Sequence, residues 1–169
     1  MNRLFPIFLV ALLSIPSFAN AQSNNGYTAS QNAYLVPSIG YFDVVTTDDT
    51  AVQFGLEYRF ASRYWNLRPV VGINVSTDES IYGYGGVYWD IDLWQSGFFF
   101  SPNLVAGFYE DGDGLNLGGT VAIRTGVEVS YDVGNRHRVG VAFNHISNAG
   151  IYDRNPGAET ILFNYQLPF

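Results

Sequence analysis

Residues 52–60 read Val-Gln-Phe-Gly-Leu-Glu-Tyr-Arg-Phe, and this stretch decides the fold class. Every even position is apolar, whereas every odd position is polar or Gly. A period of two is typical of a β-strand whose two faces meet different surroundings. The polar face carries Glu57 and Arg59, which can pair with each other or with partners on neighbouring strands inside a small barrel.

The same alternation recurs along most of the chain. Residues 117–131 place Val and Ile on one face and Arg124 and Glu128 on the other, and residues 158–169 carry an apolar-aromatic face. Clusters of Gly, Asn, Asp and Pro separate these segments, as expected of turns. Counting the segments predicts strands at roughly residues 32–44, 50–61, 66–76, 80–91, 97–109, 116–131, 137–147 and 158–169.

Composition favours a membrane barrel over a soluble sheet. Charged residues make up 14 % of the chain and aromatic residues 17 %, whereas soluble domains average about 25 % charged residues. No apolar run after residue 21 approaches the ~20 residues of a membrane-spanning helix, but most predicted strands reach the ~9–11 residues of a tilted span. Together with the even strand number, these features predict an all-β fold, an eight-stranded antiparallel transmembrane β-barrel over residues 32–169.

The charge balance excludes several functions. The net charge is −7, and all eight basic residues are Arg. Binding to nucleic acid requires a basic surface, so no nucleic-acid partner is expected. The chain has no Cys and no cluster of metal ligands, so neither a disulfide, a metal nor another cofactor is expected.

The N-terminal residues predict export. Residues 4–13 form an apolar run, and Ala19 to Ala21 form an A-x-A cleavage pattern, so residues 1–21 read as a cleaved signal peptide. Residues 22–31, rich in Ser and Asn, are expected to form a flexible lead-in. The terminal Phe169 resembles the C-terminal signature that the barrel-assembly machinery reads. This makes the machinery a partner in biogenesis and the bacterial outer membrane the expected location.

Three polar residues break the apolar pattern of the lipid-facing wall. Strand parity in residues 137–147 places His145 and Ser147 on the outward face, and parity in residues 158–169 places Glu159 there too. A charge on this face costs about 2–4 kcal/mol at the bilayer midplane and less near the interfaces. Polar groups within a membrane therefore suggest a functional site. The alternative is that all three lie above the membrane, where their polarity costs nothing.

The spacing of these residues suggests nucleophilic catalysis. His145 and Ser147 lie on one face about 7 Å apart along a strand, and antiparallel pairing of His145 with Glu159 places these two side chains about 5 Å apart. Ser147 then serves as the nucleophile, His145 as its base and Glu159 as the group that orients the imidazole. The backbone N–H groups of Asn148 and Gly150 are candidate donors to the oxyanion.

The sequence His-Ile-Ser-Asn-Ala-Gly at residues 145–150, with Glu159 twelve residues after the serine, resembles the active-site region of the PagL family, the lipid A 3-O-deacylases. The resemblance is strongest over residues 142–169; upstream it consists of matching size and strand layout. It implies a serine esterase that removes the 3-position acyl chain from lipid A of lipopolysaccharide in the outer membrane. It assigns His145, Ser147 and Glu159 to the family's catalytic positions.

The expected topology suits a lipid substrate. With both termini periplasmic, the seventh strand ends at the external side, so the three residues lie at the level of the outer leaflet and open sideways to membrane lipid. Arg154, in the loop over residues 148–157, is a candidate contact for lipid phosphates.

Two alternatives compete with the esterase. One is a non-catalytic outer-membrane barrel that acts as an adhesin or a structural protein. The other is a soluble β-sandwich, which leaves the terminal Phe169 and the outward aromatic faces unexplained. The sequence does not fix the oligomeric state, and a homodimer is compatible with it.

Overall fold

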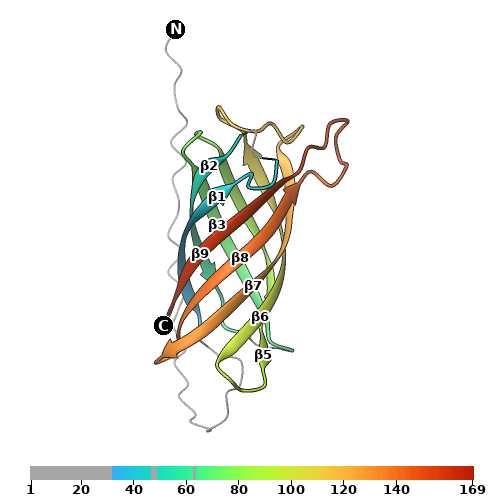
Figure 1. The fold of residues 1–169 in the computed structure, drawn as a ribbon. Coiled ribbons are helices and arrows are strands. Elements are labelled where there is room, and N and C mark those ends of the chain that lie inside the picture. Colours follow the sequence, from blue (N-terminus) through green and yellow to red (C-terminus); the bar gives the residue numbers. More distant parts are fainter. Residues whose placement is uncertain (1–31, 47–48, 63) are drawn as a thin grey trace.

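The chain forms a closed antiparallel β-barrel (Figure 1). The computed structural model describes residues 32–46, 49–62 and 64–169; the predicted signal peptide and lead-in lie outside them. Within these residues nine strands occur: β1 (Tyr34–Phe42), β2 (Ala51–Arg59), β3 (Leu67–Ser76), β4 (Ile81–Trp89), β5 (Ile91–Leu93), β6 (Phe98–Glu110), β7 (Val121–Gly134), β8 (His137–Ser147) and β9 (Ala158–Pro168).

Strands that follow each other in the chain pair around the barrel, except β4 and β5, and two further pairings close it. β1 pairs with β9, and β4 pairs with β6 from Ile81↔Glu110 to Tyr88↔Asn103. The short β5 pairs with the same edge of β6 as β4 does, farther along that strand, so β4 and β5 together occupy one position in the barrel. The predicted eight-stranded antiparallel barrel is therefore confirmed.

Two predicted strands differ from the observed ones. The fourth is interrupted at Asp90, whose buried carboxylate accepts hydrogen bonds from Arg68, Arg138 and Ser101 at 3.1, 3.1 and 3.0 Å. The sixth begins at Val121 rather than at residue 116. Residues 111–120 instead form a loop, because Leu117 turns inward and is buried at the barrel mouth.

The two ends of the barrel differ (Figure 1). The long loops over residues 111–120 and 148–157 lie at one end, whereas the short β7–β8 turn and the C-terminal Phe169 lie at the other. Outer-membrane barrels have short periplasmic turns and longer external loops. We therefore call the end with the two long loops the external end.

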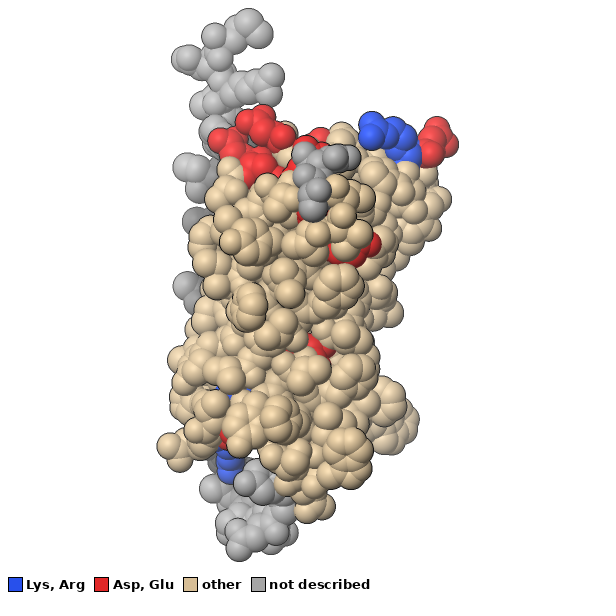
Figure 2. Space-filling view, viewed as in Figure 1, with Lys and Arg blue, Asp and Glu red and all other residues tan. Residues whose placement is uncertain are grey.

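The wall alternates as the sequence predicts, with polar residues inside and apolar residues outside. In β2, Glu57 and Arg59 are buried at 5 % and 2 % exposure, whereas Phe54 and Leu56 are each 46 % exposed. The outer wall is largely free of charge, and acidic residues gather at the external end (Figure 2). No helix in the described residues is long and apolar enough to cross a membrane.

Buried ion pairs fill the barrel interior. The Arg59 guanidinium donates two hydrogen bonds to Glu128, both of 2.8 Å, and a third of 2.8 Å to Glu57. Glu57 also accepts from Arg124 at 3.0 Å and from the Tyr84 hydroxyl at 2.8 Å. Such charges are tolerated away from water only when paired and hydrogen-bonded. The interior of a barrel this small is filled by its side chains.

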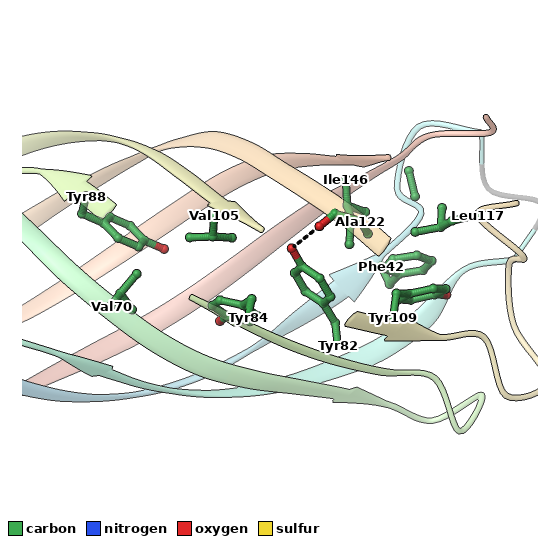
Figure 3. Packing of buried hydrophobic residues seen from close by; sticks show 11 residues of the cluster. Phe42, Val70, Tyr82, Tyr84, Tyr88, Val105, Tyr109, Leu117, Ala122 and Ile146 are labelled. Atoms are coloured by element: carbon green, nitrogen blue, oxygen red, sulfur yellow. Dashed lines mark hydrogen bonds between the residues drawn. The ribbon is translucent and has the colours of Figure 1, made fainter. Parts of the chain in front are cut away.

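Nearer the external end the interior becomes apolar. Phe42, Tyr109 and Leu117 pack there with Ala122 and Ile146 (Figure 3). Ile146 points inward between His145 and Ser147, so its 3 % exposure fixes which side of β8 faces the core. The outward direction of the two polar residues follows from this burial.

Glu128→Ala removes the main partner of Arg59 and leaves a buried, partly unpaired charge. We expect the free energy of unfolding to fall by about 3–5 kcal/mol. Equilibrium urea unfolding in lipid vesicles, followed by Trp fluorescence, measures the change. The exposed Glu110, changed to Ala, is the control and should alter stability by less than about 0.5 kcal/mol. Equal effects of the two substitutions would contradict the structural role assigned to the network.

Candidate active site

His145 and Glu159 lie directly opposite each other on β8 and β9. His145 Nδ1 and Glu159 Oε1 are 2.9 Å apart on the outer wall, where the side chains are 48 % and 23 % exposed. An ionised carboxylate can only accept a hydrogen bond, so Nδ1 carries the hydrogen. This tautomer leaves Nε2 free to accept a proton.

Ser147 follows on the same face of β8 and is half-buried. Its Oγ accepts a hydrogen bond of 3.4 Å from the Ala149 N–H. Among the residues that the structure describes, no hydrogen bond joins Ser147 to His145. A bond between nucleophile and base is commonly long before substrate binds and tightens in the complex.

Gly157 forms part of the wall around the imidazole and was not singled out by the sequence. A Cβ atom at this position would lie 3.0 Å from Nε2 of His145 and closer still to Cε1. Real Cβ atoms essentially never approach a ring so closely. The missing side chain therefore leaves the space that the His145 ring occupies, although a lone Gly after Pro156 reads in the sequence only as a turn.

Asn148 connects the end of β8 to the external loops. Its fully buried side chain donates hydrogen bonds to the backbone oxygens of Leu117 and Arg154, at 2.6 and 2.5 Å. Its own N–H donates to Asn155 Oδ1 at 3.0 Å, and the Gly150 N–H donates to Asn148 Oδ1 at 2.9 Å. Both predicted oxyanion donors therefore hydrogen-bond within the loop here.

The site opens onto an apolar wall. On β7, Thr125 lies opposite His145 and Ile123 lies opposite Ser147. Phe143, one outward position before His145, is 45 % exposed. Acyl chains of membrane lipid can therefore reach the three polar groups from the side. Across the described chain, no three His, Asp or Glu side chains come close enough to hold a metal ion.

Two solved structures are similar to this chain. The crystal structure of the outer membrane enzyme PagL is 18 % identical over 80 % of this chain and 99 % of that chain, with a TM-score of 0.60, and shows the same fold. The backbone structure of the Yersinia pestis outer membrane protein Ail in a nanodisc is 13 % identical, with the same two coverages and a TM-score of 0.48. A search of curated proteins found no match.

A family model supplies the assignment. The model described as lipid A 3-O-deacylase (PagL) matches residues 33–168, which include almost the whole barrel. The match extends over β8 and β9, the strands that carry His145, Ser147 and Glu159. The chain therefore belongs to the PagL family, the ester hydrolases of the outer membrane that act on lipid A.

Proposed function

We propose that this chain removes the 3-position acyl chain of lipid A with Ser147 as nucleophile, His145 as general base and Glu159 as the orienting carboxylate. The observation that carries the proposal is the 2.9 Å His145–Glu159 pair on the lipid-facing wall, two residues before Ser147 on the same face. A structural barrel gains nothing from exposing such a pair to lipid. The family consists of ester hydrolases, so the assignment argues against the alternative of a non-catalytic adhesin or structural barrel.

The three side chains can perform both halves of an ester hydrolysis. Nε2 of His145 takes the Ser147 proton while Oγ bonds to the ester carbonyl carbon. The tetrahedral intermediate collapses, the bond to the sugar oxygen breaks, and His145 returns the proton to that oxygen. A water molecule then attacks the acyl carbonyl carbon while His145 takes its proton. The bond to Oγ breaks, the fatty acid is released, and His145 returns the proton to Ser147. Glu159 stabilises the imidazolium in both halves.

The backbone N–H groups of Asn148 and Gly150 remain our proposed oxyanion donors. In this structure both donate to neutral amide oxygens in the loop. Hydrogen bonds to a charged acceptor are roughly twice as strong as those between neutral groups. A developing oxyanion beside Ser147 is therefore expected to displace the side-chain oxygens of Asn155 and Asn148.

Two predicted partners belong to this proposal rather than to the family assignment. The barrel-assembly machinery is expected to recognise the terminal strand that ends in Phe169. A homodimer stays a prediction, which sedimentation of the purified protein in detergent tests.

Ser147→Ala removes the nucleophile and should abolish deacylation. Mass spectrometry of lipid A from cells that express the wild-type protein should show the loss of one hydroxyacyl chain, and cells that express the variant should keep it. Heat-modifiable electrophoretic mobility checks that both barrels are folded. Unchanged lipid A with folded wild-type protein would overturn the proposed function.

Glu159→Gln keeps the side-chain shape but removes the charge that stabilises the imidazolium. We expect kcat to fall by about 10²–10⁴ with little change in KM. Initial rates on purified lipid A in detergent micelles measure both constants. Glu110→Gln, an exposed change at the end of β6, is the matched control. A wild-type kcat for Glu159→Gln would rule out the assigned role.

Gly157→Ala places a methyl group against the imidazole and should displace it from Glu159 and Ser147. A misplacement of about 1 Å can cost on the order of 100-fold in rate. Gly83→Ala is the matched control, because nothing lies within 4 Å of a Cβ there. We expect both variants to fold and only Gly157→Ala to lose kcat. Full activity of Gly157→Ala would show that the imidazole does not need this space.

A further inference from the structure

An open hollow of about 540 Å³ lies at the external end, next to the loop that follows Ser147. Its lining comes from both long loops and consists of Asn116, Gly118, Ile151, Tyr152, Asp153 and Arg154. Binding sites for small molecules commonly have volumes of ~300–1,000 Å³. The hollow is therefore large enough for a sugar with its substituents.

Contacts between the two loops hold the hollow in shape. The Asn148 side chain binds the backbone oxygens of Leu117 and Arg154, one on each loop. A Cβ at Gly118 would collide with the Arg154 carbonyl oxygen, so only glycine permits this approach. The Tyr152 hydroxyl accepts a 3.2 Å hydrogen bond from the Val121 N–H. Since Asn148 directly follows Ser147, the same residue fixes the hollow relative to the proposed nucleophile.

Arg154 gives the hollow a positive charge, which the other described residues exposed at the external end lack. Its side chain is exposed, whereas the four arginines within the strands, Arg59, Arg68, Arg124 and Arg138, are at most 2 % exposed. The exposed Arg136 lies at the opposite end, on the β7–β8 turn. In the part of the chain that the structure describes, Arg154 is thus the one exposed arginine at the external end, where acidic residues gather.

The chemistry of the substrate indicates which of its groups lies next to the hollow. The ester that Ser147 attacks is joined directly to a sugar carbon, so the sugar must lie within a few bond lengths of Oγ. The acyl chain extends along the apolar wall, which leaves the sugar at the external side, at the loop over residues 148–157. In lipid A this sugar is a phosphorylated glucosamine.

We propose that the hollow binds the phosphorylated glucosamine of lipid A, with Arg154 contacting a phosphate; this inference rests on the proposed function. A guanidinium binds phosphate through paired, charge-assisted hydrogen bonds. Asp153 and Asn116 can accept hydrogen bonds from sugar hydroxyl and amide groups. Ile151 and Tyr152 supply the apolar surface that packs against a sugar ring.

The test compares Arg154→Ala and Arg154→Lys with Arg136→Ala, a matched change at the opposite end. Purified protein in detergent acts on phosphorylated lipid A and on the same lipid A after removal of its phosphates. We expect Arg154→Ala to lower kcat/KM about ten- to hundredfold on the phosphorylated substrate, mainly through KM. It should leave the dephosphorylated substrate unaffected. Arg154→Lys should recover part of the loss, and Arg136→Ala should match the wild type.

A binding assay separates failure of this inference from failure of the proposed function. Each Arg154 variant is combined with Ser147→Ala and compared with the Ser147→Ala protein that keeps Arg154. Binding of labelled lipid A is measured with and without inorganic phosphate. Weaker binding of phosphorylated lipid A by the Arg154→Ala protein supports the hollow even if no turnover is seen. The inference is overturned if phosphorylated lipid A binds equally to the Ser147→Ala protein with and without Arg154→Ala. It is also overturned if Arg154→Ala lowers activity equally on both substrates, or if inorganic phosphate binds as tightly as lipid A.

Discussion

The whole structure depends on an antiparallel sheet that closes on itself within a membrane. Lipid offers no partner to a backbone N–H or C=O, and each unpaired group costs several kcal/mol. Pairing of β4 with β6 completes the ring of strands, and the short β5 extends that pairing past Asp90. Closure gives every strand an inner and an outer face, and it therefore sets the environment of each side chain by its parity.

The interior that results is polar through its lower part and apolar near the external end. Glu57 and Arg59 of β2 pair with Arg124 and Glu128 of β7, so these four charges satisfy one another across the barrel interior. Close to the proposed site, Ile146 is packed among apolar side chains. This packing behind β8 supports His145 and Ser147 rigidly, as the catalytic role that we propose for them requires.

The site itself belongs to one hairpin and the loop that joins its strands. The register of β8 and β9 brings His145 to Glu159. Asn148 ties the loop to the neighbouring loop over residues 111–120, and Gly157 leaves room for the imidazole. The proposed ester-cleaving site on the lipid-facing wall can thus receive a substrate that moves within the membrane plane, and the hollow lies where we propose that the sugar binds.

The sequence by itself determined the strand number and which residues face outward. A period of two ties each residue's face to its position, so the outward placement of His145, Ser147 and Glu159 could be predicted without coordinates. Only the tertiary structure decided the break at Asp90, because that carboxylate binds arginines from β3 and β8. Local periodicity in the sequence does not reveal contacts between segments that are far apart in the chain.

The loops, too, were predicted in part from the sequence and in part only by the tertiary structure. Turn residues in the sequence predicted the approximate positions of the loops. They did not predict that Leu117 folds inward or that Asn148 joins the two long loops. The need for Gly157 was likewise hidden, because its neighbour His145 lies twelve positions away in sequence and touches it only once the hairpin has formed. The sequence thus determined the faces of the strands, and tertiary packing decided the space around the proposed active site, since that space depends on distances between chain segments.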